Sequence, residues 1–194
     1  MSKLYFKYGA MGSSKSAQAL MTRFNYIQKG YDVLLMKPII DNRDVVDGKI
    51  VVKSRIGIFA NCKVFDKDTD LTKFVKNLGF LDDKKVVIID EVQFCTEKQI
   101  DELHDISTVV PVLCYGLLTN YKTKLFEGSK RLIEVAESIS EIKSVCSCGR
   151  KATVNGRFIN NKLVYEGEEI AIGSDESYAG MCYTCYKKLK NETK

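Results

Sequence analysis

Long apolar runs and a signal peptide are both missing from this sequence. No stretch approaches the roughly 18 apolar residues that a membrane-spanning helix requires, so we expect no such span. The N-terminus from Met1 to Tyr8 lacks the plan of a signal peptide, because its apolar stretch is short and has the pattern of a strand. We therefore expect a cytoplasmic protein.

The sequence also lacks an internal repeat, a low-complexity tract and a concentrated basic face. Its lysines are spread along the chain, apart from a cluster near the C-terminus at Lys187, Lys188, Lys190 and Lys194. The net charge of +5 suits a phosphate-bearing ligand, but solubility alone also explains it. A dedicated nucleic-acid binder concentrates its basic residues on one face, so we do not expect nucleic acid as a partner.

The sequence does contain an alternation of apolar strands and amphipathic helices. With 194 residues, 45% of them hydrophobic, it can form one main domain with a small appendage. The run from Val86 to Asp90 has no polar alternation, as expected of a strand buried on both faces of a parallel sheet. A helix predicted at 15–28 carries Leu20, Phe24 and Ile27 on one face.

This alternation predicts an α/β fold with a parallel sheet flanked by helices. Beyond Val145, glycines, tyrosines and paired cysteines replace the periodic segments, so we expect two domains, 1–145 and 146–194. The predicted strands are 3–8, 32–37, 86–90, 109–115 and 139–145, with a hairpin at 50–52 and 56–59. The predicted helices are 15–28, 71–78, 97–103 and 129–136.

A glycine- and serine-rich turn joins the first predicted strand to the first helix. A loop at a helix N-terminus directs several backbone N–H groups at one point, where the helix dipole adds positive potential. The turn therefore predicts a P-loop, whose lysine reaches the β- and γ-phosphates of a nucleotide and whose last serine contacts Mg²⁺. Its residues are Gly9, Ala10, Met11, Gly12, Ser13, Ser14, Lys15 and Ser16.

The P-loop departs from the usual pattern at one position, because Ser14 replaces the glycine before the lysine. If the backbone there needs a positive φ, the serine costs strain; otherwise nothing is lost. A chance turn before a helix is the alternative interpretation of the whole segment.

Two acids, Asp90 and Glu91, end the apolar strand at 86–90. In a Walker B arrangement, an acid at a strand tip lies beside the Mg²⁺ of the P-loop. We expect Asp90 to hold the metal and Glu91 to act as a general base on a hydroxyl nucleophile, although a turn or capping pair is the alternative. After the second strand lie Asp41 and Arg43, of which Arg43 could stabilise a transferred phosphoryl group or belong to a solvated loop.

Four of the seven cysteines form two close pairs near the C-terminus, Cys146 with Cys148 and Cys182 with Cys185. In a reducing compartment such pairs indicate metal more often than a disulfide. Their spacing predicts a small zinc ribbon, in which Zn²⁺ holds together a segment too poor in apolar residues to fold alone. Four unrelated cysteines are the alternative. The other cysteines are expected to be buried and inert: Cys62, Cys95 and Cys114.

Together these motifs resemble the type II thymidine kinase family, found in bacteria and in the animal cytosol. The resemblance runs from Leu4 to about Lys188, and its most specific part is the match of Asp90-Glu91-Val92-Gln93-Phe94 to the family's DExQF signature. The departures are Ser14 and the CxC spacing of the first cysteine pair. Further similar segments are the P-loop with Met11, Lys37-Pro38 with Asp41-Asn42-Arg43, Tyr115-Gly116-Leu117 with Tyr121, and Ile172-Gly173 with Tyr178.

The resemblance implies a kinase that transfers the γ-phosphate of ATP to the 5′-hydroxyl of thymidine or deoxyuridine in deoxynucleotide salvage, with Glu91 as the base. It also implies Mg²⁺, a structural Zn²⁺, a homotetramer and feedback inhibition by thymidine triphosphate. On the nucleotide side it adds Asp41, Arg43, Asp90 and Gln93 to the P-loop residues. A zinc-anchored lasso would close over the base, and the residues implied around the nucleoside are Met11, Phe94, Leu117, Tyr121, Glu169, Ile170, Ala171, Ile172, Gly173 and Tyr178.

Two other hypotheses stay open on the residues alone. A nucleic-acid-stimulated P-loop ATPase with a zinc ribbon would share the same motifs, but a motor core is usually longer and exposes basic and aromatic residues that track single strands. A nucleotide-binding scaffold without catalysis is the other hypothesis, and Glu91 beside an intact P-loop argues against it.

Overall fold

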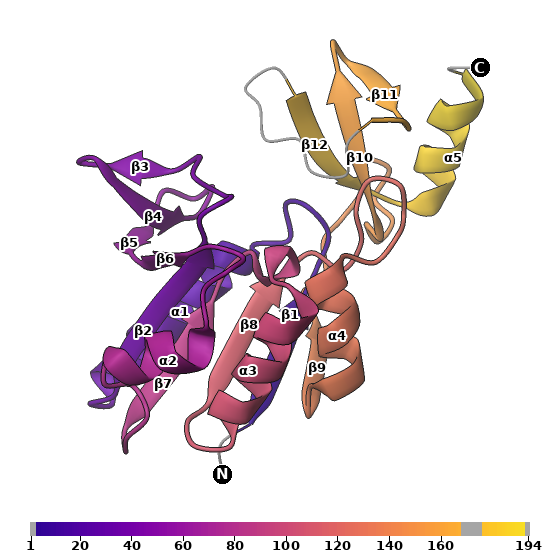
Figure 1. Ribbon diagram of the computed structural model, residues 1–194. Coiled ribbons are helices and arrows are strands. Elements are labelled where there is room, and N and C mark those ends of the chain that lie inside the picture. Colours follow the sequence, from indigo (N-terminus) through magenta and orange to yellow (C-terminus); the bar gives the residue numbers. More distant parts are fainter. Residues whose placement is uncertain (1–2, 168–175, 193–194) are drawn as a thin grey trace.

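The computed structural model describes residues 3–167 and 176–192, and a six-stranded sheet forms its centre (Figure 1). Its strand order is β6-β2-β7-β8-β1-β9, and every neighbouring pair is parallel. The predicted parallel α/β sheet is therefore confirmed. Its strands are β1 (Leu4–Tyr8), β2 (Asp32–Pro38), β6 (Lys63–Phe65), β7 (Lys85–Ile89), β8 (Val112–Gly116) and β9 (Ser138–Glu141).

Helices cover both faces of this sheet. In β7, Val86 and Ile88 pack on the side of α1 (Lys15–Gln28), whereas Val87 and Ile89 pack on the opposite side. Both sides are fully buried, which explains the unbroken apolar run. Within the described residues, no helix is long and apolar enough to cross a bilayer. The opposite side is covered by α2 (Leu71–Asn77), α3 (Glu97–Ser107) and α4 (Glu127–Val135) (Figure 1).

The predicted apolar face of α1 is only partly buried. Leu20 is 7% exposed and packs on the sheet, whereas Phe24 is 57% exposed and Ile27 is 42% exposed. Met21, on the same helix, is 56% exposed. In the second half of the helix, the side chains of this face therefore form an apolar stripe that the described part of the chain does not cover.

Several predicted strand boundaries differ from the structure for local reasons. The strand predicted from Val109 begins at Val112, because Pro111 has no N–H to donate to a sheet. In the predicted hairpin, β4 (Lys49–Lys53) pairs with β5 (Phe59–Asn61), since residues 54–58 form the turn between them. The last strand of the main sheet ends at Glu141 rather than at Val145. A short strand, β3 (Val45–Val46), pairs with the other edge of β4.

A smaller antiparallel sheet and a helix form the C-terminal part of the described chain. The strand order is β11-β10-β12, and a small core that includes Cys146 and Cys182 lies beneath it. The sheet approaches the P-loop closely, because a Cβ added at Gly180 would lie 2.4 Å from the carbonyl oxygen of Met11. The elements are β10 (Val154–Ile159), β11 (Lys162–Val164), β12 (Glu176–Met181) and α5 (Tyr183–Glu192).

The start of α4 also packs tightly, against the 3-10 helix η1 (Val92–Phe94). A Cβ at Gly128 would lie 2.7 Å from the carbonyl oxygens of Val92 and Cys95. We predict that Gly128→Ala lowers the free energy of unfolding by about 1–3 kcal/mol, although alanine favours helices, because two backbone segments must separate.

Urea denaturation followed by circular dichroism checks this prediction, since the chain has no tryptophan to report by fluorescence. Lys130→Ala, on the exposed side of the same helix, is the control and should stay within about 0.5 kcal/mol of the wild type. Equal stability of Gly128→Ala and the wild type would contradict the close packing of α4 on η1.

Candidate active site

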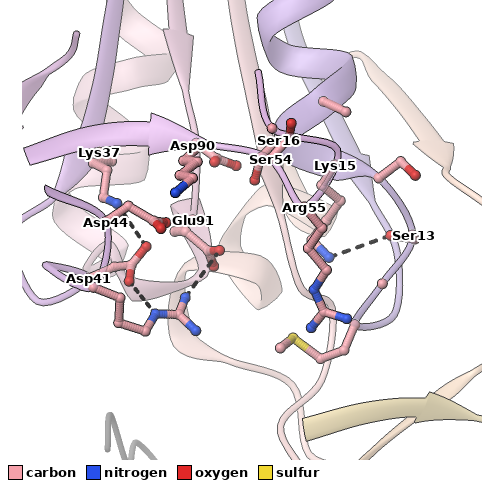
Figure 2. A pocket seen from close by; sticks show the side chains of 17 residues that line it. Ser13, Lys15, Ser16, Lys37, Asp41, Asp44, Ser54, Arg55, Asp90 and Glu91 are labelled. Carbon is pink, nitrogen blue, oxygen red and sulfur yellow. Dashed lines mark hydrogen bonds and ion pairs between the residues drawn. The ribbon is translucent and has the colours of Figure 1, made fainter. Parts of the chain in front are cut away.

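The parallel sheet brings three sequence motifs to one place. The P-loop follows β1, Asp41 follows β2, and Asp90 follows β7, so all three leave the carboxyl ends of strands. They surround a cavity of about 370 Å³ (Figure 2). Its lining residues are Met11, Gly12, Ser13, Ser14, Lys15, Ser16, Ala17, Lys37, Asp41, Arg43, Asp44, Lys53, Ser54, Arg55, Gly57, Asp90 and Glu91.

The P-loop turns through two residues with left-handed backbone conformations. Gly12 has φ 77°, and Ser14 has φ 63° and ψ 24°. This conformation costs a residue with a Cβ roughly 1–2 kcal/mol. Ser14 therefore has the backbone strain that a positive φ at this position was expected to cause. The strain is stored directly before Lys15, where α1 begins and where its first N–H groups are free to meet a phosphate.

Lys15 is buried within the loop that precedes it. Its Nζ donates to the carbonyl oxygens of Ala10 at 3.0 Å and Gly9 at 3.3 Å, and to Ser13 Oγ at 3.4 Å. Burial lowers its pKa, and the charges of Glu91 and Asp90 act in the opposite direction. The loop thus holds a cation whose hydrogen bonds to neutral oxygens can be exchanged for bonds to an anionic ligand.

Asp90 is a buried acid at the tip of β7, only 3% exposed. Burial and the neighbouring charge of Glu91 raise its pKa to about 7, whereas a hydrogen bond with the Ser16 side chain acts to lower it. Its Oδ1 atom is buried and has no hydrogen-bond partner among the described residues. An unsatisfied carboxylate oxygen beside a serine hydroxyl fits a divalent cation, because Mg²⁺ prefers such oxygen ligands.

Glu91 is held in a strained backbone conformation, with φ 55°. Its Oε2 accepts a hydrogen bond from Nε2 of Gln93, and Oε1 of Gln93 accepts one from the backbone N–H of Leu117 at 3.0 Å. Gln93 is itself buried and lies outside the cavity lining. The amide therefore positions the carboxylate of Glu91 from behind, a role that sequence reasoning missed.

A chain of charges crosses the cavity from β2 to Glu91. Asp41 Oδ2 lies 2.9 Å from Lys37 Nζ, and Asp41 Oδ1 lies 2.6 Å from Arg43 Nε. Arg43 Nη2 in turn lies 3.7 Å from Oε1 of Glu91. Burial raises the pKa of Asp41, but the hydrogen bonds and charges of Arg43 and Lys37 outweigh this effect and lower it. Asp41 is therefore an ionised anchor that orients Arg43.

The four paired cysteines come together in space as predicted. The Sγ atoms of Cys146, Cys148, Cys182 and Cys185 all lie within 4.8 Å of one another, and those of Cys148 and Cys182 are 3.6 Å apart. Tetrahedral Zn²⁺ with bonds of about 2.3 Å needs sulfur atoms roughly 3.8 Å apart, so this cluster fits the metal. Backbone hydrogen bonds from Cys148 and Cys182 lower the pKa of Cys146 to about 6, whereas hydrogen bonds with the other three thiols raise the pKa of Cys185 to about 12. Zn²⁺, which requires thiolates, would therefore displace a proton from Cys185.

A family model for thymidine kinases matches residues 2–186 of the chain. The chain belongs to the thymidine kinase family. It is 40% identical over 192 residues to the thymidine kinase of Enterobacteria phage T4, with 97% of each chain covered. It is 38% identical over 191 residues to that of Vibrio cholerae, with 97% of this chain and 98% of the relative covered. The thymidine kinase of Zymomonas mobilis is 40% identical over 185 residues, with 94% of each covered.

The nucleoside residues implied by the thymidine kinase resemblance are only partly gathered at the cavity. Met11 lines it, whereas Phe94, Leu117 and Tyr121 do not. Tyr121 is 1% exposed, with the guanidinium of Arg157 over its ring at 5.2 Å. Tyr178 lies on β12, half-buried and opposite Arg157. Five implied residues lie outside the described part of the chain: Glu169, Ile170, Ala171, Ile172 and Gly173.

The structure also reveals a buried amide that the sequence did not indicate. Asn155 on β10 accepts a hydrogen bond at its Oδ1 from the backbone N–H of Met11 at 2.8 Å. Its Nδ2 donates to the carbonyl oxygen of Thr119 at 2.7 Å. One side chain of the C-terminal sheet thereby fixes both the P-loop and the loop after β8. Nothing in the residues around position 155 could have indicated this link, because its partners lie far away in the sequence.

Further cavity residues come from the turn between β4 and β5 and from the loop after β2. Lys53, Ser54 and Arg55 line the cavity together with Asp44. A Lys-Ser-Arg sequence is ordinary for a surface loop. These residues are recognised as part of the cavity only because the β3-β4-β5 sheet folds next to the P-loop.

The buried Asp90 predicts a pH dependence of stability. Its folded-state pKa of about 7 exceeds the unfolded value near 4, so the folded, metal-free protein binds more protons between these limits. The stabilising contribution of Asp90 should therefore be complete below about pH 4 and be lost as the pH rises through 7. We predict that Asp90→Asn is more stable than the wild type at pH 8 by at least about 1 kcal/mol and that this difference shrinks toward pH 5.

Thermal unfolding in EDTA between pH 5 and pH 8.5 measures the effect. Adding excess Mg·ATP at pH 8 should make the wild type more stable than Asp90→Asn. The ligand stabilises the folded protein in proportion to its affinity, and the variant lacks the acid that would hold Mg²⁺. If the difference between Asp90→Asn and the wild type were constant across the whole pH range, Asp90 would not titrate near neutrality.

Proposed function

We propose that this chain transfers the γ-phosphate of ATP to the 5′-hydroxyl of thymidine, forming thymidine monophosphate. Membership of the thymidine kinase family supports thymidine and ATP as the substrates. The observation that carries the proposal is the position of Glu91, whose carboxylate shares one cavity with Lys15 and Ser16 of the P-loop. Phosphoryl transfer to a hydroxyl uses a base, a loop that binds phosphates and an acid that binds the metal. Candidates for all three line this one cavity.

On the donor side, backbone N–H groups at the start of α1 hold the triphosphate, and Lys15 exchanges its loop carbonyls for phosphate oxygens. Ser16 and Asp90 would hold Mg²⁺, directly or through water. When bound there, Mg²⁺ neutralises charge on the donor phosphates. The orphaned Oδ1 of Asp90 supports this assignment.

On the acceptor side, Glu91 takes the proton of the 5′-hydroxyl. At the same time the 5′-oxygen of the nucleoside attacks the γ-phosphorus in line with the bond that breaks. Gln93 fixes the carboxylate before substrate arrives, so little reorganisation is needed at the moment of reaction. Arg43, oriented by Asp41, stabilises the charge that develops on the phosphoryl group. Most of the rate comes from such positioning and electrostatics.

The nucleoside pocket extends from Met11 toward the C-terminal part. We propose that Phe94, Leu117, Tyr121 and Tyr178 surround the base and that main-chain groups of residues 169–173 hold it. Deoxyuridine differs from thymidine by one methyl group, so the same contacts would accept it. Residues 146–194 then form a separate domain that acts as a lid, with Zn²⁺ bound by the four clustered thiols as its structural centre.

We further propose that the active form is a homotetramer inhibited by thymidine triphosphate and located in the cytoplasm. The apolar stripe of Met21, Phe24 and Ile27 on α1 supports association between copies, because large exposed apolar patches mark interfaces. Inhibition by the triphosphate follows if it occupies the nucleoside pocket and the P-loop together. A cluster of four thiols that fits a metal agrees with a reducing compartment.

A panel of natural nucleosides tests the reaction. With Mg·ATP, the purified protein should phosphorylate thymidine and deoxyuridine and leave deoxycytidine and the purine nucleosides unchanged, because the pocket selects the base. Monophosphate formation is followed by chromatography. Absence of any monophosphate, together with ATP hydrolysis that rises with single-stranded DNA, would replace this proposal by a motor ATPase.

The role of Glu91 yields a second prediction. Glu91→Gln keeps the size and hydrogen-bonding shape of the side chain but removes the base, so kcat should fall by about 10²–10⁴-fold. The dissociation constant of Mg·ATP, measured by calorimetry, should stay within about threefold of the wild type. Glu97→Gln, an exposed acid on α3, is the control and should keep full activity. Unchanged turnover in Glu91→Gln would show that another group takes the proton.

A further inference from the structure

The loop between β8 and α4, residues 117–126, is held by side chains of the C-terminal part of the chain. Figure 1 shows this loop extending from the main sheet toward β10 and α5. From β10, Asn155 Nδ2 donates to the carbonyl oxygen of Thr119 at 2.7 Å. From α5, the hydroxyl of Tyr186 donates to the backbone carbonyl oxygen of Tyr121 at 2.9 Å. The second of these bonds has no role in the function described so far.

Tyr186 is itself fixed by the segment that carries the second pair of thiols. Its side chain is buried, only 6% exposed, and the residue directly follows Cys185. Its backbone N–H donates to the carbonyl oxygen of Cys182 at 3.1 Å. The ring of Tyr165 packs edge-on against its ring, with the two centroids 5.6 Å apart. Because Cys182 and Cys185 belong to the thiol cluster, Tyr186 reaches the loop from a support that this cluster organises.

The loop that Tyr186 contacts has internal hydrogen bonds centred on the buried Asn120. Oδ1 of Asn120 accepts from the backbone N–H groups of Lys122 at 2.9 Å and Lys124 at 3.0 Å. Its own backbone N–H donates to the carbonyl oxygen of Lys124 at 2.8 Å, and its carbonyl oxygen accepts from the N–H of Thr123 at 3.0 Å. These bonds make the loop one compact unit, so an anchor at Tyr121 affects the position of the whole loop.

The same loop belongs to the pocket proposed for the nucleoside. Leu117 and Tyr121, two of the residues proposed around the base, are part of it. The loop also contacts the end of the chain segment that leads to the other proposed contacts, since Lys122 Nζ donates to the carbonyl oxygen of Gly167 at 2.7 Å. Gly167 lies just before residues 169–173, which are proposed to hold the base through main-chain groups. The position of the loop therefore affects both sets of proposed nucleoside contacts.

We propose that Tyr186 is a positioning residue for the nucleoside and that its hydroxyl holds the loop of Tyr121 in the conformation that binds the base. This inference rests on the proposed kinase function. Without the hydroxyl, the loop loses one anchor and spends less time in the binding conformation, which weakens the apparent affinity for the nucleoside. Tyr186 does not line the cavity of the P-loop, so we expect the affinity for the donor nucleotide to stay unchanged.

The test compares Tyr186→Phe with Tyr183→Phe, because each variant removes one hydroxyl from α5. Tyr183 is 60% exposed and stacks on the ring of Tyr186, so Tyr183→Phe is the matched control and should behave as the wild type. For Tyr186→Phe we expect the KM and the dissociation constant of thymidine to rise at least about fivefold. The kcat and the dissociation constant of Mg·ATP should stay within about threefold of the wild type. A general loss of folded protein would instead lower the apparent kcat and leave both affinities unchanged.

Amide hydrogen exchange, measured by mass spectrometry on the ligand-free protein, reports on the loop directly. Peptides that cover residues 119–125 should exchange at least about fivefold faster in Tyr186→Phe, whereas β7 and the control variant should match the wild type. Unchanged exchange in this loop, or a smaller rise in the KM for thymidine, would overturn the inference. If the wild type phosphorylates no nucleoside, the proposed function fails and the role of Tyr186 toward a nucleoside fails with it. The exchange rates then still decide whether Tyr186 anchors the loop.

Discussion

Parallel pairing of β1, β2, β7 and β8 is the constraint on which the site depends. Because these strands share one direction, the loops that follow them leave from one edge of the sheet. The P-loop, Asp41 and Asp90 therefore meet in one cavity although about 80 residues separate the first from the last. The fully buried apolar side chains of β7 secure this arrangement, since they pack against helices on both faces.

The cavity combines charges that are incompletely compensated by the protein itself. Within the described residues, Lys15 bonds only to neutral oxygens and Asp90 has a buried oxygen without a partner. In contrast, Asp41, Lys37 and Arg43 satisfy one another. A donor nucleotide with its metal would supply the anion that Lys15 lacks and the cation that Asp90 lacks.

The C-terminal part is connected to the P-loop through direct contacts. The side chain of Asn155 bonds to the backbone of Met11, and the absence of a side chain at Gly180 allows β12 to approach the same residue. The small core of this part contains Cys146 and Cys182, which belong to the thiol cluster. Zn²⁺ bound by that cluster would stabilise the sheet that carries Asn155, and through Asn155 it would stabilise the P-loop.

The sequence by itself determined the α/β class, the P-loop, the acids after β7 and the four thiols, because each depends on residues that are neighbours along the chain. It predicted the apolar face of α1 but not which part of that face is buried, since local periodicity cannot tell which apolar side chains a neighbouring element will cover. The nucleoside residues came only from resemblance to a family. Tertiary structure alone decided the contacts of Gln93 and Asn155. Their partners are brought close by strand order and by the folding of two small sheets over the P-loop, and a polar side chain carries no sign of a distant partner in its own surroundings.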